Sequence, residues 1–150
     1  MGTSTRSMQV SINKLPDSLD TLGQMAFCYG GDNITISSIP TNLKSLESYV
    51  FNNCENVCIT MIPASVTLMK ERALALCGRN YNNGDPTDIT VYIGANNVDM
   101  AKEKINKDAF YGYMGGAENT NLHFYFPNMN AVDIASIAGY WGLGENNVQD

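Results

Sequence analysis

Apolar and polar residues along this chain recur with a period of 23 or 24 residues, not with the period of a single helix or strand. The segments that follow Pro16, Pro40 and Pro63 align without a gap and read PDSLDTLGQMAF, PTNLKSLESYVF and PASVTLMKERAL. In each segment apolar residues stand three, six, ten and eleven positions after the proline. Periods of this length are typical of proteins built from stacked structural repeats.

A fourth, looser copy begins at Ile93-Gly94 and carries about five extra residues. It lacks the proline and follows an insertion, GRNYNNGDPTD. The position fourteen residues after the proline is Gly30 in the first copy and cysteine in the next two. The corresponding apolar positions of the fourth copy are Ile105, Ala109, Phe110 and Tyr113.

Each copy divides into two parts at its proline. A short run of β-forming residues precedes the proline, and the proline ends the run because it cannot donate to a ladder. After the proline, apolar spacings of three and four residues favour one or two turns of α- or 3₁₀-helix. The predicted fold is an α/β repeat solenoid with a parallel β-sheet on one face and short helical or 3₁₀ turns on the other. The five predicted strands read VSINKL, ITISSI, VCITMI, ITVYI and LHFYF.

The repeat resembles the BspA-like subclass of leucine-rich repeats, found in bacterial and protozoan surface proteins and in some phage proteins. The resemblance covers residues 10–127, leaving 1–9 as a flexible or partner-bound segment and 128–150 as a C-terminal cap or docking tail. It implies a short leucine-rich-repeat stack and says almost nothing about chemistry. One copy matches the family pattern at Ile39, Pro40, Leu43, Leu46, Val50, Phe51, Cys54 and Val57, and the next at Ile62, Pro63, Val66, Met69, Ala73, Leu74 and Cys77.

The resemblance also sorts the strand residues into inward and outward positions. Positions one, three and six before each proline are expected to point inward, which places Ser37 and Thr60 in the core. Positions two and four are expected to point outward and to form a partner-binding face. There are two alternatives. The insertion or the C-terminal tail covers these residues, or the register is shifted by one residue, which exchanges inward and outward positions. The predicted face contains Ile36, Ile59, Met61, Tyr92, His123 and Tyr125.

The tail after Pro127 has its own helix signals. Asn130 is a plausible N-cap for a helix over 131–138, and a Gly-rich stretch follows it. One interpretation is a cap over the last strand, since the ends of a repeat stack present unpaired edges. The other is a docking peptide anchored by Tyr140, Trp141 and Leu143, because large aromatic residues dominate many interfaces.

Charge and composition narrow the choice of partners. The 150 residues carry a net charge of −6, and only nine are Lys or Arg, which are scattered along the sequence. A nucleic-acid surface is therefore not expected. The first residues do not resemble a signal peptide, and no apolar run is long enough to span a membrane. Cys28, Cys54, Cys58 and Cys77 are expected to be thiols.

Candidate chemistry is sparse in this sequence. His123 is the single histidine and stands beside aromatic residues. The spacing of Cys54 and Cys58 is too wide for a zinc knuckle, and no P-loop, nucleophile elbow or dinucleotide motif is present. We therefore expect no enzyme activity, no metal and no cofactor.

These features together predict a non-catalytic protein-binding or assembly module, with other proteins as partners and a homo-oligomer as one possibility. The resemblance implies surface adhesins, but the missing export signal favours a small structural or accessory component of a phage virion, for decoration or host attachment. The alternative is an ectodomain fragment of a bacterial adhesin that binds host proteins or glycans. The expected location is therefore a virion or an extracellular surface.

Overall fold

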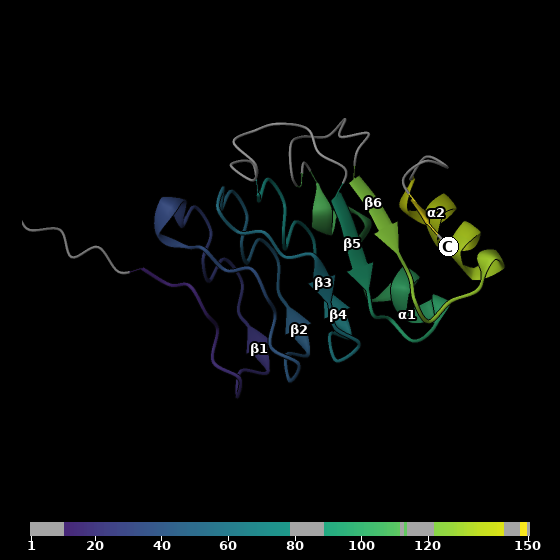
Figure 1. Ribbon diagram of the computed structural model, residues 1–150, viewed down its shortest axis with the longest axis horizontal. Helices are drawn as coiled ribbons and strands as arrows, with labels where there is room; N and C mark the ends of the chain where they lie inside the picture. Colours follow the sequence, from purple (N-terminus) through teal and green to yellow (C-terminus); the bar gives the residue numbers. More distant parts are fainter. Residues whose placement is uncertain (1–10, 79–88, 112, 114–121, 143–147, 150) are drawn as a thin grey trace, which may run out of the picture.

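The computed structural model describes residues 11–78, 89–111, 113, 122–142 and 148–149. Successive repeat units lie side by side, from β1 at one end to α2 at the other (Figure 1). Their strands form two parallel sheets, and helices are few. The described helices are the 3₁₀-helices η1 (Gly31–Asn33) and η3 (Lys107–Phe110) and the α-helices α1 (Val98–Glu103) and α2 (Ala131–Trp141).

The first sheet is built from the segment after each proline. Its strands are β1 (Thr21–Leu22), β2 (Ser45–Leu46) and β4 (Leu68–Met69), in the order β1-β2-β4. Register pairs Leu22 with Leu46 and Leu46 with Met69, which are equivalent positions of successive copies. The prediction of helical turns at these positions is wrong for the first three copies. A spacing of three between apolar residues fits a two-residue strand between turns as well as it fits a helix turn.

The second sheet is built from the segment before each proline. Its strands β3 (Met61–Ile62), β5 (Ile89–Ile93), β6 (Leu122–Tyr125) and β7 (Val148–Gln149) follow in the order β3-β5-β6-β7, all parallel. In the first two copies the same segment forms a single bridge, between Ile12 and Ile34. The predicted strands are therefore longest in the last units, where β5 and β6 pair over four residues.

Two left-handed residues recur in each of the first three copies, nine and thirteen positions after the proline. Their φ angles lie between +53° and +61° although none of them is glycine. This conformation costs an ordinary residue about 1–2 kcal/mol. Between them, backbone N–H groups of one unit donate to carbonyls of the next, as from Phe27 to Val50 at 2.8 Å and from Phe51 to Ala73 at 2.9 Å. The six residues are Met25, Tyr29, Tyr49, Asn53, Arg72 and Leu76.

The core lies between the two sheets and is continuous along the stack. Phe51 is fully buried and stacks on Phe27 with ring centroids 5.3 Å apart. Buried thiols link neighbouring units, since Cys54 donates to the Phe27 carbonyl and Cys77 to the Phe51 carbonyl, each at 2.8 Å. The apolar positions that carried the family pattern are therefore core positions, as predicted.

The strand register differs from the prediction in the second and third copies. Ile36 and Ile59 are fully buried, whereas Ser37 is exposed and Thr60 partly exposed. Two consecutive residues, such as Ser37 and Ser38, point outward before the last inward residue, Ile39. This breaks the strict alternation of a strand. At Ile59 the buried Tyr113 hydroxyl accepts from the backbone N–H at 2.7 Å and donates to the carbonyl at 2.6 Å, which satisfies both groups at the break.

In β5 and β6 the alternation is regular, with Val91, Ile93, Leu122 and Phe124 buried. Gly94 stands where earlier copies have proline, and a Cβ there would lie 2.6 Å from the Ala64 backbone nitrogen. The close approach of two backbones explains this glycine.

Helix α2 begins where the sequence predicted it. The Asn130 side chain accepts hydrogen bonds from the backbone N–H groups of Val132 and Asp133, both at 3.0 Å. The helix runs three residues beyond the predicted end and stops at Gly142, whose φ of +69° gives a left-handed C-cap. It packs against α1, so that it covers the core of the last units.

Candidate protein-interaction surfaces

Side chains from three strands form one row on the outer face of the second sheet, in which two residues are exposed and the third is partly exposed. Register pairs Met61 with Tyr92 and Tyr92 with Tyr125, so the three residues stand at the same level of β3, β5 and β6. Met61 is 59% exposed and Tyr92 is 41% exposed. His123 lies on β6 two residues before Tyr125 and pairs with Thr90. We call Met61, Tyr92, His123 and Tyr125 the strand-face patch.

The patch is organised by ring contacts as well as by register. The Tyr92 and Tyr125 rings meet edge to face, with centroids 5.4 Å apart and planes 79° apart. This arrangement is a favourable one for aromatic pairs. In the first two copies the same level is occupied by the exposed Lys14 and Ser38. The apolar part of the face therefore begins at the third copy and continues into the last units.

Three residues predicted for partner binding are core residues instead. Ile36 and Ile59 have no exposed surface, because the alternation breaks between them and their prolines. Trp141 is 7% exposed and its indole N–H donates to the Ala101 carbonyl at 3.3 Å. The indole also contacts three buried aromatic rings at centroid distances from 5.6 to 6.1 Å, those of Phe110, Phe124 and Phe126. These positions are not available to a partner.

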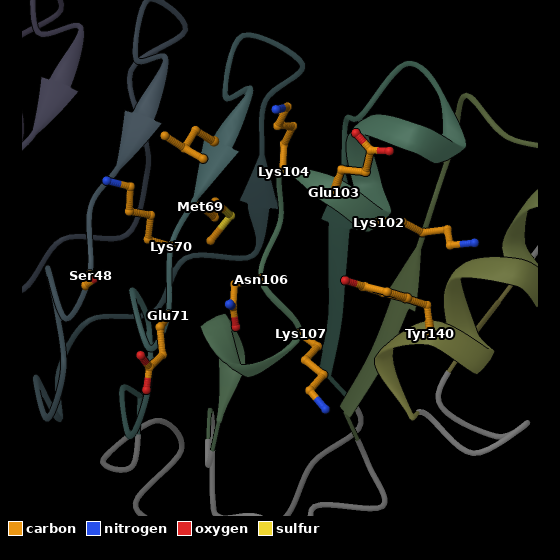
Figure 2. A pocket seen from close by; sticks show the side chains of 11 residues that line it. Ser48, Met69, Lys70, Glu71, Lys102, Glu103, Lys104, Asn106, Lys107 and Tyr140 are labelled. Atoms are coloured by element: carbon orange, nitrogen blue, oxygen red, sulfur yellow. The ribbon is translucent and has the colours of Figure 1, made fainter.

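Tyr140 lies apart from the strand-face patch, at a groove between the repeats and the C-terminal helix. It is 52% exposed, and its ring extends from α2 into the groove (Figure 2). The groove has a volume of about 410 Å³. Its floor and walls come from β4, α1, η3 and α2. We call this site the lysine groove, and its cationic residues are Lys70, Lys102, Lys104 and Lys107.

The four lysines of the groove are not equally neutralised. Lys70 is paired with Glu47, and Lys102 donates to the Ser136 hydroxyl at 3.2 Å and lies 5.6 Å from the centre of the Tyr140 ring. Lys104 and Lys107 are exposed, and within the described residues neither makes an ion pair. Anionic groups of a ligand could therefore bind either lysine without breaking an existing pair; the two side chains point toward opposite ends of the groove (Figure 2).

Carboxylates limit the positive potential of the groove. Glu71 and Glu103 also line it. Glu71 accepts a hydrogen bond from the Tyr49 hydroxyl at 3.1 Å. That hydrogen bond, then burial and the carboxylate charge, raise the pKa of Tyr49. The groove is thus suited to a ligand that combines anionic groups with an apolar surface for Tyr140.

The groove was not predicted, because all nine Lys and Arg residues were treated as scattered along the chain. Four of the nine cationic residues of an acidic chain come together there. A local signal existed in the segment KEKINK over 102–107, which supplies three of them. The fourth, Lys70, lies near them only because neighbouring units stack. This proximity cannot be recognised from the local sequence.

In the described ranges, the cysteines and the other potential metal ligands are not gathered into a cluster. All four cysteines lie in the described part of the chain and are thiols, as predicted. Burial raises the pKa of Cys54, and it raises the pKa of Cys58 to about 11. Both are therefore protonated at neutral pH and weak nucleophiles. Among the residues that the structure describes, no group of three or more His, Cys, Asp or Glu side chains could hold a metal ion.

No helix within the described ranges is long and apolar enough to cross a membrane.

The stacked parallel ladders and the recurring buried leucine positions define a leucine-rich repeat. The family model of the BspA-type leucine-rich repeat region, with six copies, matches residues 5–90. Because the match covers more than half of the 150 residues, the chain belongs to this family. Neither a search of curated proteins nor a search of solved structures found a match.

Family membership suggests a class of function and not a partner. The repeat is a protein-interaction repeat, and it is generally non-catalytic. Proteins with BspA-type repeats are often found at the extracellular surface. The match ends at residue 90, so it includes β3 and the start of β5 but neither β6 nor the C-terminal helix.

Proposed function

We propose that this chain is a non-catalytic protein-binding module that contacts its partner through the strand-face patch. The observation that carries the proposal is the row of the exposed Met61 and Tyr92 and the partly exposed Tyr125 across three paired strands. Tyr and Met are enriched at protein interfaces, and large aromatic residues carry much of the binding energy there. A flat face of this kind fits the surface of a folded protein.

Rigidity supports this assignment. The backbone of β5 is paired on both sides, with β3 and with β6, so Tyr92 projects from the centre of the sheet. The ring contact with Tyr125 further restricts its side chain. A contact made by side chains that are already ordered loses less conformational entropy on binding than one made by a mobile loop.

The setting we propose is a larger assembly in which the module is a structural or accessory part, such as a phage virion. The occurrence of BspA-like repeats in some phage proteins supports this setting, and the composition of the native complex tests it. Native mass spectrometry of the protein isolated from its source, with identification of every co-purifying chain, should show a stable complex with structural proteins. Isolation as a free chain would contradict the assembly role.

The patch itself is tested with the partner identified in that way. The double variant Met61→Ala with Tyr92→Ala should weaken binding at least tenfold, because it truncates two exposed apolar anchors. Its melting temperature should stay close to that of the parent protein. A matched control is Val132→Ala, a change of one exposed residue, 79% accessible, on α2. Unchanged affinity of the double variant would contradict the proposed binding face.

The alternative is an adhesin ectodomain that binds host proteins or glycans, and the lysine groove favours its glycan form. Lys104 and Lys107 offer charges that no described carboxylate neutralises, and Tyr140 offers an aromatic surface on which a sugar ring can stack. An acidic oligosaccharide satisfies both features. A glycan array should then show binding to acidic sugars that falls on Lys104→Gln with Lys107→Gln and is retained in Lys14→Gln, a change of an exposed lysine in the first copy.

A further inference from the structure

The first described unit has an open backbone edge at β1, whose equivalents in the next two units are hydrogen-bonded to the unit before them. Within the second unit, the N–H groups of Ser45 and Glu47 donate to the first unit, and the carbonyls of Ser48, Val50 and Asn52 accept from it. The third unit presents the same kind of edge to the second. The first unit has no preceding unit among the described residues, and β1 is the outer strand of its sheet.

The equivalent groups of the first unit can be named from the repeat. They are the N–H groups of Thr21 and Gly23 and the carbonyls of Gln24, Ala26 and Cys28. Within the described part of the chain, none of these five groups makes a backbone hydrogen bond. Unpaired edges of this kind are sites where another chain can add.

Apolar residues at the same end are less buried than their equivalents in the next unit. Val50 and Phe51 have no exposed surface, whereas Ala26 is exposed and Phe27 is partly exposed. Met25 is 53% exposed next to them. The end therefore offers both open hydrogen-bonding groups and an apolar surface, as an inner unit does before the next one stacks on it.

The order of donors and acceptors along this edge makes it complementary to itself. The donors Thr21 and Gly23 come first, and the acceptors Gln24, Ala26 and Cys28 follow in the turn after β1. A twofold axis between Gln24 and Met25 reverses this order in a second copy. Each donor then faces an acceptor, Thr21 with Cys28 of the second copy and Gly23 with Ala26 of the second copy.

We propose that the N-terminal end is the interface of a homodimer in which two copies stack end to end about this twofold axis. An isologous contact of this kind is closed, because both copies use the same edge, that of β1. The other end does not compete for the contact, since α2 packs its Trp141 over the aromatic core of the last units. The interface is separate from the strand-face patch, which begins at β3 in the third copy and continues over β5 and β6.

Analytical ultracentrifugation of the full chain over a range of concentrations tests the dimer. The parent protein should shift reversibly from monomer to dimer, and Ala26→Arg should remain a monomer because a charged side chain then stands in the contact. Val132→Arg adds the same charge at an exposed site on α2 and should dimerise like the parent. A parent protein that is monomeric at every concentration, or a dimer that persists in Ala26→Arg, would overturn the proposal.

Hydrogen exchange measured by NMR provides a second readout that needs no variant. The amides of Thr21 and Gly23 should exchange quickly at low concentration and become protected as the dimer forms. The amide of Phe27, which already donates to Val50, serves as an internal reference. Protection of Thr21 and Gly23 that does not change with concentration would refute the proposed contact even if the protein dimerises in another way.

Discussion

The first three repeats, over 11–78, and the last units, over 89–142, solve the same stacking problem with different local structures. The first three repeats have two-residue strands in the first sheet, left-handed turns and thiol-to-carbonyl bonds, and their described residues include no α-helix. The last units have longer strands, two α-helices and a cluster of aromatic rings around Trp141. A repeat stack can therefore be continued by units that no longer match its sequence pattern.

The position fourteen residues after the proline shows how the change is made. A cysteine is small enough to sit under the neighbouring turn and to donate one hydrogen bond to it. Tyr113, at the corresponding position, reaches much farther and bonds both backbone groups of Ile59. These bonds occur where the strand alternation breaks. The tyrosine that replaces the cysteine of the family pattern therefore stabilises the junction between the two regions.

The largest predicted effect concerns the core of the first region. Phe51→Ala should lower the free energy of unfolding by about 3–5 kcal/mol, because it leaves a large cavity in a fully buried site. Urea denaturation at low protein concentration measures it. The matched control is Phe27→Ala, the same change one unit earlier, where the ring is only partly buried and the loss should be clearly smaller. Equal losses would mean that the end of the stack is covered in the monomer.

The next effect concerns the junction between the regions. Tyr113→Phe removes the hydroxyl and leaves the N–H and the carbonyl of Ile59 buried without their partner. Each orphaned group should cost about 1–3 kcal/mol of stability. Tyr111→Phe, at a ring that is 45% exposed, should change stability little. Similar stability of the two variants, measured by thermal unfolding, would show that the Tyr113 hydroxyl does not support the junction.

Much of the first region, and the start of α2 in the last units, could be predicted because the signals for both are local. The positions of Leu43, Leu46 and Phe51 are buried as the periodicity required, and Asn130 caps α2 as its residue type indicated. The burial of Ile36 could not be predicted by counting back from Pro40. The alternation of inward and outward residues breaks between the two positions, so the count assigns Ile36 to the wrong face.

The candidate surfaces were predicted less completely than the fold. Met61 and Tyr92 are exposed as expected, because β5 keeps its alternation and pairs in register with β3. The lysine groove depends on the distance in space between Lys70 and the segment 102–107, which is fixed by how the units stack. That information is not contained in any one stretch of the sequence.

Alkaline pH should destabilise both regions through groups that are neutral when folded. Burial raises the pKa of Cys58 from 9.0 to about 11 and raises that of Tyr113 well above 10.0. A raised folded-state pKa gives stability that is fully present below the unfolded-state pKa and is lost as the pH rises toward the folded value. The melting temperature should therefore fall above about pH 9. Cys58→Ala should make this fall less steep, and an identical pH profile would contradict the role of that thiol.

The smallest predicted effect is a difference in stability between Gly and Ala variants, which should have opposite signs in the two regions because their backbone conformations differ. Met25 has a φ of +57°, which glycine adopts at no cost and alanine does not, so Met25→Gly should be about 1 kcal/mol more stable than Met25→Ala. At the exposed Ala135 in α2 the order should reverse, with Ala135→Gly about 1 kcal/mol less stable than the parent, because glycine weakens a helix interior.

Chemical denaturation of the three variants and the parent, under identical conditions, measures both differences. The comparison between Gly and Ala at one position isolates the backbone, since neither residue contributes side-chain contacts beyond one methyl group. Preference for alanine at both positions would mean that the turn at Met25 is right-handed in solution. Preference for glycine at Met25 alone would show that the first three repeats maintain their narrow turns against a conformational cost, which the inter-unit hydrogen bonds of the same turns, such as that from Phe27 to Val50, must offset.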